Sequence, residues 1–387
     1  MKKIFMITES GYPVVGGGGL ENQITTISSG LLKRGIKVRV IAPISNFSPN
    51  KIVDEHEGIE IYRISYPQIR VIGTVVFLLS LALHLLRNRS EYIALHCQGA
   101  HNTAAIGCLI GRLVGKPVVV KLTGWWEIEY GILKSDGINL HIRFLRWATK
   151  KATYYQTISG HLARLLEERG YSKAKIIRLP NAVDTARFDL DAGDSANSLH
   201  SQYDFKLIGL FTGRLVPEKG LNLLIDAWVE AFGPDEDSAL LIVGEGDLDE
   251  ALQEKINDHN RQHQIFLTGS TADVQPYLAI ADYGLLTSFN EGLSNTLLEF
   301  MSNGLPVIGS RISGTEDVIK HGENGWLYTS VEVQELTKSL LELKSKSKQE
   351  LQKMGHAGRA FITEYAGVGS VAERLASLYE STNEPTQ

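Results

Sequence analysis

The sequence of 387 residues has few features that would anchor it in a membrane or cross-link it. It contains two cysteines, Cys97 and Cys108, both in apolar surroundings. This excludes a disulfide framework and favours buried thiols in a reducing compartment. The apolar run at 71–86 is shorter than the ~20 residues of a membrane-spanning helix and contains Ser80 and His84, so it predicts a packed crossover helix. The N-terminus lacks a full signal-peptide core. We therefore expect a cytoplasmic protein.

Two motifs common in nucleotide enzymes and metal sites are incomplete or badly placed. Four glycines at 16–19 separate an expected strand (2–8) from an expected helix (20–34), but the third glycine of the dinucleotide fingerprint is missing. The next strand, 36–42, ends without an acidic residue for a ribose, so we do not expect NAD. Three Asp-x-Asp triplets lie in linkers and turns, which favours turn acids over metal ligands: 189–191, 235–237 and 247–249. We predict no cofactor and no catalytic metal.

The charge is divided unevenly along the chain. Residues 1–182 hold 24 Lys and Arg against 12 Asp and Glu, whereas the remainder holds 15 against 32. The basic half favours an anionic partner, either an acidic membrane leaflet or a lipid-phosphate acceptor. Attraction between two complementary domains is the competing explanation, and we do not expect nucleic acid.

Strands and helices alternate twice along the chain, which predicts an α/β fold with two doubly wound, Rossmann-like domains. The first domain is expected at 1–182. A polar stretch at 183–204, rich in Asp, Ser and Asn, predicts a linker. The second domain is expected at 205–369.

The stretch 287–304 carries two glutamates after a short apolar strand. We expect Glu291 in the turn before a helix, and Glu299 two turns inside a helix that begins after Gly292 and ends at Asn303-Gly304. Backbone N–H groups at the start of this helix favour an anion, and the carboxylates are acceptors for sugar hydroxyls. A first-turn acid with a solvated helix glutamate is the alternative.

A second motif, residues 211–220, follows a strand and opens a helix. Arg214 and Lys219 flank Pro217 beyond the strand end, where two cations make a clamp for a diphosphate. Two unrelated surface cations are the alternative.

These motifs together resemble retaining glycosyltransferases of family 4, the glycosyl transferases group 1, which have the GT-B fold. The resemblance covers nearly the whole chain and rests on the two glutamates, the two cations, the glycines and three further segments: LPNAVDTARF at 179–188, VGEGDL at 243–248 and GLPVIGS at 304–310. It implies two domains facing a central cleft. It also implies that the final helix, within 370–387, packs back on the first domain.

The resemblance also implies roles for individual residues. Arg214 and Lys219 would neutralise the diphosphate of a nucleotide-sugar donor, and Glu299 would accept its ribose hydroxyls. Glu291 would hold the donor sugar. Further donor contacts would come from the glycines and from the backbone after Glu291: Gly17, Gly18, Gly213, Gly292, Leu293 and Ser294. The family needs no protein nucleophile and retains the anomeric configuration. A nucleotide-sugar epimerase and a non-catalytic nucleotide-sugar-binding protein are the alternatives.

The sequence departs from the family where many members have a cleft histidine. Thr123, Gly124 and Trp125 occupy that place, and His96 or His101 could substitute. We expect His101, Trp125 and Trp126 on the acceptor side, although the aromatic residues could instead fill the domain core. The acceptor is expected to be a glycan or a lipid-linked sugar of a polysaccharide pathway.

A helix at 138–151 carries Arg143, Arg146 and Lys150 beside Phe144 and Trp147. A basic and aromatic helix of this kind can lie on an anionic membrane surface, which predicts peripheral association. A solvated outer face is the alternative. The nucleotide and the sugar are not determined by the sequence.

Overall fold

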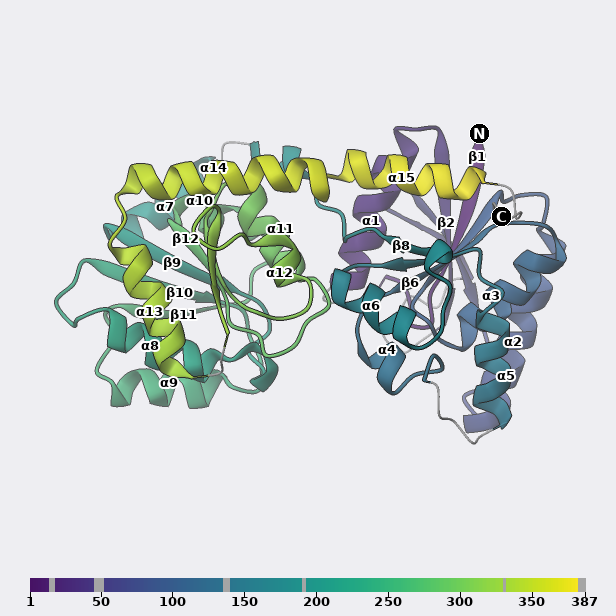
Figure 1. The fold of residues 1–387 in the computed structure, drawn as a ribbon, viewed down its shortest axis with the longest axis horizontal. Coiled ribbons are helices and arrows are strands. Elements are labelled where there is room, and N and C mark those ends of the chain that lie inside the picture. The colour runs from purple at the N-terminus through teal and green to yellow at the C-terminus, as the bar shows by residue number, and fades with distance from the viewer. Residues whose placement is uncertain (14–17, 45–51, 135–139, 190–192, 330–331, 382–387) are drawn as a thin grey trace. The chain divides into compact units, whose positions relative to one another are not determined.

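The computed structural model describes residues 1–13, 18–44, 52–134, 140–189, 193–329 and 332–381 (Figure 1). The chain forms two compact units. Unit 1 consists of Met1–Ala182 and Val368–Gln387, and unit 2 of Val183–Gly367. Each unit has its own sheet, with helices on its faces, so the expected α/β class is confirmed.

Unit 1 is built on an eight-stranded sheet with the order β3-β4-β2-β1-β5-β6-β7-β8. All pairs are parallel except β3 with β4, a hairpin that the sequence did not predict. Growth of the sheet changes direction between β1 and β5, the topological switch point at which α/β proteins bind ligands. The strands are β1 (Lys2–Ile7), β2 (Ile36–Pro43), β3 (Val53–His56), β4 (Ile59–Ile64), β5 (Ala94–Gln98), β6 (Val118–Leu122), β7 (Tyr154–Thr157) and β8 (Ile176–Arg178).

The helices of unit 1 include one from the far end of the chain. Helix α15 (Val368–Glu380) packs on α1 (Gly19–Leu32), and Ile24, Leu31, Val371 and Leu375 lie in one buried cluster. Gly30 permits this approach, because a Cβ at that position would lie 2.7 Å from Val368. The other helices are α2 (Arg70–Arg87), α3 (Asn102–Leu113), α4 (Trp126–Glu129), α5 (Leu140–Thr149), α6 (Gly160–Glu168) and the 3₁₀ turn η1 (Lys173–Lys175).

Helix α2 contains the apolar run that the sequence predicts to be a packed crossover helix. The run is helical, but only one of its faces is packed, and Val75 and Leu79 on the other face are exposed. Among the residues that the structure describes, no helix is long and apolar enough to cross a membrane.

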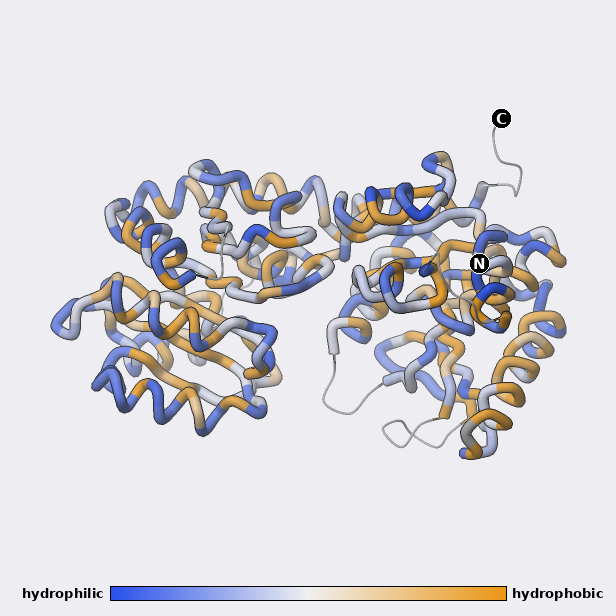
Figure 2. Tube along the Cα trace, turned by 60° about the horizontal axis from the view of Figure 1, so that its bottom comes forward, coloured by the Kyte–Doolittle hydropathy of each residue, from blue (hydrophilic) through white to orange (hydrophobic). Residues whose placement is uncertain are grey.

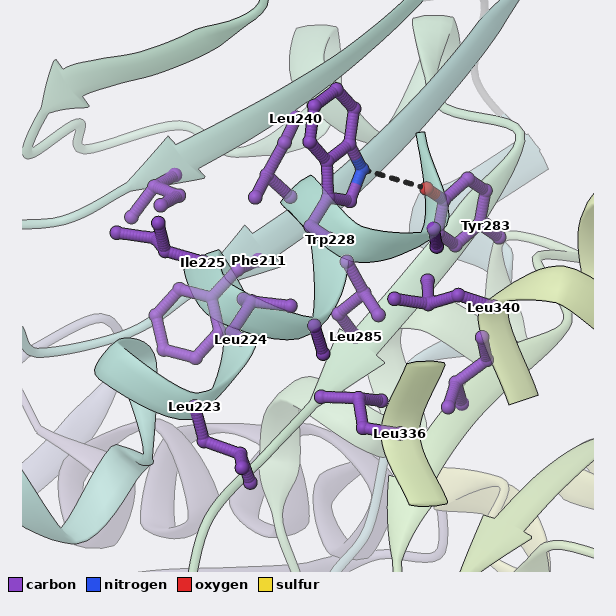
Figure 3. Packing of buried hydrophobic residues seen from close by; sticks show 14 of the residues in the cluster. Phe211, Leu223, Leu224, Ile225, Trp228, Leu240, Tyr283, Leu285, Leu336 and Leu340 are labelled. Carbon is purple, nitrogen blue, oxygen red and sulfur yellow. Dashed lines mark hydrogen bonds between the residues drawn. The ribbon is translucent and has the colours of Figure 1, made fainter. Parts of the chain in front are cut away.

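Unit 2 is built on a six-stranded parallel sheet with the order β11-β10-β9-β12-β13-β14. Its switch point lies between β9 and β12. In the core beside these strands, the Trp228 indole donates a hydrogen bond to the Tyr283 hydroxyl at 3.3 Å, surrounded by leucines (Figure 3). The strands are β9 (Leu207–Thr212), β10 (Ser238–Val243), β11 (Ile265–Gly269), β12 (Tyr283–Leu286), β13 (Val307–Ser310) and β14 (Gly325–Tyr328).

The helices of unit 2 include two elements in the segment expected to be a linker. Within 183–204 lie η2 (Thr185–Asp189) and α7 (Gly193–Gln202), and α7 packs on α10 (Gln275–Ile280), so this segment is part of unit 2. The remaining helices are η3 (Pro217–Lys219), α8 (Leu221–Ala231), α9 (Asp249–Asp258), α11 (Asn295–Ser302), α12 (Thr315–Val318), α13 (Val333–Lys344) and α14 (Lys348–Tyr365).

Candidate active site

The two motifs of unit 2 meet at its switch point. The loop after β9 and the loop after β12 follow adjacent strands. The Thr287 hydroxyl donates to the Lys219 carbonyl at 2.8 Å, and the Phe289 N–H donates to the Glu218 carbonyl at 2.8 Å. Gly220 makes this contact possible: its φ is +66°, and a Cβ there would lie 2.2 Å from the Thr287 carbonyl oxygen. Residues about 70 positions apart thus form one surface at the carboxyl ends of the strands.

Lys219 and Glu291, expected to contact different parts of one ligand, contact each other. The Lys219 ammonium donates to Glu291 Oε1, and the Ser288 hydroxyl donates to the same oxygen at 2.7 Å. Both charged side chains are mostly covered, with 23% and 14% of their surface exposed. An anion that reaches Lys219 would therefore compete with Glu291 for its ammonium group.

Arg214 lies on the same loop but is exposed. Within the described residues, its guanidinium has no hydrogen bond or ion pair. Its backbone is fixed by neighbours: Gly213 has φ +150° and donates to the Val243 carbonyl at 3.0 Å, and Leu215 donates to the Glu245 carbonyl at 3.0 Å. The VGEGDL segment (243–248) thus holds the backbone beside Arg214 at the end of β9. The guanidinium group of Arg214 stays exposed, so an anionic ligand can reach it.

Glu299 lies nearer to the helix start than the sequence predicts. Helix α11 begins at Asn295 with Ser294 as its N-cap, so Glu299 is one turn inside it, not two. Burial raises the pKa of Glu299 to about 7, and the charge of Arg187 on η2 opposes this rise. Arg187 belongs to the 179–188 segment, but sequence reasoning gave it no role.

The backbone before α11 is packed tightly. Gly292, Leu293 and Ser294 are buried. The Ser313 hydroxyl donates to the Gly292 carbonyl at 3.4 Å. A Cβ on Gly314 would lie 2.1 Å from that carbonyl oxygen. The position of this segment is therefore determined by unit 2 itself.

The glycine loop of unit 1 is described only at its end. Gly18 is the N-cap of α1 in an extended conformation, and Gly17 lies outside the described residues. The predicted donor contacts of Gly17 and Gly18 stay predictions.

The switch point of unit 1 brings together an acid and a base. Glu9 follows β1 and His101 follows β5, and Glu9 Oε2 lies 3.3 Å from His101 Nδ1. Burial raises the pKa of Glu9, and the nearby His101 opposes the rise. Sequence reasoning selected His101 but not Glu9, although Glu9 directly follows a buried strand.

A buried acid, Glu127, positions the tryptophan loop. Glu127 accepts hydrogen bonds from the Ala100 N–H at 2.6 Å and the Thr123 N–H at 2.7 Å, so it joins the ends of β5 and β6. Trp125 and Trp126 lie on the loop that it holds. Trp126 is 45% exposed, so it does not fill the core.

His96, the other candidate for the missing histidine, is in the interior. Its side chain is buried, and Nδ1 lies 2.6 Å from the Tyr379 hydroxyl of α15. Burial lowers the pKa of His96 to about 3. Between the two histidines, the geometry therefore favours His101 for contact with a ligand.

Two of the Asp-x-Asp triplets bind backbone N–H groups. Asp249 accepts from the Gly246 N–H at 3.0 Å within a local turn, whereas Asp237 accepts at 3.2 Å from the N–H of Lys206, which lies 31 residues earlier in the chain. In the third triplet, Asp191 lies outside the described residues.

Comparisons with known proteins cover both units. Residues 17–187 match the family model described as Glycosyltransferase Family 4, and residues 206–346 match the one described as Glycosyl transferases group 1. An uncharacterized glycosyltransferase of Methanocaldococcus jannaschii is 25% identical over 94% of this chain and 96% of its own length. A galactosyltransferase of Escherichia coli, named for the substrates UDP-Gal and α-D-GlcNAc-diphosphoundecaprenol, is 26% identical over 64% of this chain and 65% of its own.

A solved structure shows the same fold. The Anabaena protein HepE, crystallised with UDP, is 19% identical, has a TM-score of 0.77 and is matched over 97% of this chain and 99% of its own.

Proposed function

The chain belongs to the family 4 glycosyltransferases of the GT-B fold, and we propose that it transfers a hexose from a nucleotide-diphosphate sugar, with retention of configuration, to a glycan or lipid-linked acceptor. One observation carries this proposal. Lys219 and Glu291 come from two separate motifs and form an ion pair at the switch point of unit 2, with Arg214 on the loop of Lys219 and Glu299 one turn inside the helix that follows Glu291. Two cations with two carboxylates match a ligand that has a diphosphate at its centre and hydroxyls on both sides.

In the proposed reaction, the diphosphate replaces Glu291 as the partner of Lys219. Arg214, which has no competing partner among the described residues, binds the same group. Negative charge grows on the diphosphate as the bond to the sugar breaks, so cations already in place lower the barrier. Glu291, released from Lys219, then accepts hydroxyls of the donor sugar, and Glu299 accepts those of the ribose.

Retention follows from proton transfer on one face of the sugar. The acceptor hydroxyl attacks from the side that the nucleotide leaves, and its proton passes to the departing phosphate oxygen. No protein nucleophile takes part, and the two cations supply the positive charge without a metal ion. Both features are part of the proposal.

We place acceptor binding on unit 1, at His101, Trp125 and Trp126. The imidazole can hydrogen-bond a hydroxyl, and the half-exposed Trp126 offers a flat apolar surface for a sugar ring. The lipid-diphosphate substrate in the name of the E. coli relative supports a lipid-linked sugar as the acceptor class. We propose a polysaccharide or glycoconjugate pathway on the cytoplasmic side of a membrane.

Thermal unfolding with UDP, GDP, ADP and NAD is the first test of the donor site. The UDP in the Anabaena structure makes UDP the first nucleotide to examine. A ligand present at 100 times its dissociation constant stabilises the folded protein by about 2.7 kcal/mol. We expect one nucleoside diphosphate to raise the midpoint, and Arg214→Ala to abolish this shift without changing the midpoint of the protein alone.

Transfer is then assayed with the matching labelled nucleotide sugar and a lipid extract, followed by NMR of the anomeric configuration. Arg214→Ala should lower the rate by about 10²–10³. A shift with NAD alone, or with no nucleotide, would contradict the proposed donor site. Donor consumption without any transfer product would favour an epimerase.

A further inference from the structure

Helix α2 is apolar on two opposite faces, and only one of them is covered. Gly73, Phe77, Leu81 and Leu85 repeat every four residues and are buried against unit 1. The opposite side, here called the exposed face of α2, consists of Val71, Ile72, Val75, Leu79 and Leu83, which are 46–72% exposed. The tube coloured by hydropathy shows a helix that is hydrophobic along most of its length at the right of the molecule (Figure 2).

This pattern differs from that of an ordinary surface helix, whose outer face is charged or polar. Single exposed aliphatic residues are common, whereas a continuous apolar patch marks an interaction surface. Here five large aliphatic side chains follow one another along a single helix. The exposed face of α2 therefore fits an apolar phase or an apolar partner.

A second helix adds aromatic and basic residues to the same layer. Helix α3 contacts both α2 and α5, so α2 and α5 flank it (Figure 1). On α5, Leu140, Phe144 and Trp147 are 49–78% exposed. Arg143 is exposed beside them.

The charge of the two helices indicates which partner they fit. Together α2 and α5 contain four arginines and no Asp or Glu. A second copy of this chain would present the same positive charge, and the two faces would repel each other. An anionic lipid surface offers negative headgroups directly above an apolar layer, which matches both the basic residues and the aliphatic face.

We propose that α2 and α5 dock unit 1 on the surface of an anionic bilayer. The exposed face of α2 enters the boundary between headgroups and acyl chains, and Arg87 and Arg143 contact the headgroups. Docking would bring the enzyme to the lipid-linked acceptor proposed above, but it does not depend on transfer activity, because it involves neither motif of unit 2.

Co-sedimentation of the full chain with vesicles tests this docking. The vesicles contain phosphatidylcholine with or without phosphatidylglycerol. We expect binding to the anionic vesicles, weakened by salt because headgroup contacts are screened. The triple variant Val75→Ser, Leu79→Ser, Leu83→Ser should lower the partition coefficient about tenfold or more, because it removes apolar area that the bilayer would bury.

A matched triple variant controls for the loss of exposed aliphatic residues in general. Val53→Ser, Leu32→Ser and Leu341→Ser change one valine and two leucines that are also 48–70% exposed but lie on β3, α1 and α13. This variant should bind vesicles like the unchanged protein. Arg87→Gln with Arg143→Gln should weaken binding to anionic vesicles and reduce its salt dependence.

Three outcomes would overturn the proposal. The first is that the unchanged protein does not sediment with anionic vesicles at low salt. The second is that the α2 variant and its matched control bind equally. The third is that the protein is a dimer which the α2 variant separates, because the face would then bind a second copy. Nucleotide stabilisation, measured in parallel, reports the donor site separately, so failure of docking is distinguishable from failure of the proposed function.

Discussion

Lys219 and Arg214 lie on one loop, but the structure gives them different environments. Lys219 is paired with the mostly covered Glu291, so Lys219→Ala leaves a carboxylate without its cation. We expect this variant to lower the free energy of unfolding by about 1–3 kcal/mol. Arg214 is exposed, and Arg214→Ala should change stability by less than about 0.5 kcal/mol. Urea unfolding of both variants measures the difference, and equal losses would contradict the assigned pairing.

Glu299 gives the proposed donor site a dependence on pH. Its pKa is raised to about 7 by burial, so below that pH the carboxyl group is largely protonated. If the carboxylate accepts ribose hydroxyls, binding must release this proton. We therefore expect nucleotide affinity to fall as the pH is lowered from 8 to 6, by up to about tenfold per unit below the pKa.

Glu299→Gln is the reference for this measurement, made by calorimetric titration at several pH values. The diphosphate of the nucleotide also changes its protonation with pH, but this contribution is the same for both proteins and cancels in the comparison. The variant should bind more weakly and lose the additional pH dependence. Parallel curves for the two proteins would remove Glu299 from the ribose site.

At the residue scale, the sequence indicated candidates that stand in motifs, but not the polar residues that connect neighbouring strand ends. Arg214, Lys219 and Glu291 were selected as candidates because they stand next to glycines at strand ends. Glu9 and Glu127 belong to no quoted motif, and their importance comes from contacts with Ala100, Thr123 and His101 across the sheet. The choice of His101 over His96 as the histidine that contacts a ligand also depended on the structure. The side chain of His96 points toward helix α15 in the interior, and the sequence does not predict that orientation.

At the scale of elements, the turn before α8 joins the two motif loops. Gly220→Ala would introduce a Cβ 2.2 Å from the Thr287 carbonyl, at φ +66°. We expect a loss of stability above the ~1 kcal/mol of a left-handed residue alone, together with weaker nucleotide binding because Lys219 is displaced. Gly322→Ala is the matched control, because Gly322 has φ +79° in the same unit but no atom within 4 Å of the added Cβ.

Chemical denaturation and nucleotide titration of the two glycine variants distinguish the cost of a strained backbone from the effect of disturbing the contact between the two motif loops. Gly322→Ala should show only the conformational cost and leave nucleotide affinity unchanged. If Gly220→Ala behaves in the same way, the contact between the two loops does not determine the position of Lys219.

Element positions were predictable where the hydrophobic pattern has one clear period. The strands expected at 2–8 and 36–42 are β1 (Lys2–Ile7) and β2 (Ile36–Pro43), each within one residue of the predicted ends. Helix α2 shows the limit of such patterns. Because it is apolar on two opposite faces, its sequence predicts a helix but not which of the two faces unit 1 covers.

At the scale of the whole molecule, each unit depends on pairs that are far apart in sequence. Helix α15 completes unit 1 from the opposite end of the chain, and its Tyr379 hydroxyl contacts His96 in the interior. The family resemblance implied this return of the chain, whereas composition and periodicity did not. The contact of Tyr379 with His96 could not be read from either position alone.

The burial of His96 predicts how stability changes with pH. Its pKa is about 3 in the folded protein and about 6.5 when exposed to water. Between these values the unfolded chain binds one more proton at this site than the folded chain, so this contribution to stability is lost as the pH falls from 6.5 toward 3. From pH 6.5 to 5 the loss from this group is about 2 kcal/mol.

The contribution of His96 can be separated from those of other groups by comparison with His96→Gln. Glutamine stays uncharged and can still hydrogen-bond Tyr379. His84, whose pKa burial lowers to about 4, acts in the same direction in both proteins, and so do the carboxylates. The variant should therefore lose about 2 kcal/mol less than the unchanged protein between pH 6.5 and 5, measured by urea unfolding. Equal losses would mean that His96 takes up its proton without unfolding, which its buried contact with α15 argues against.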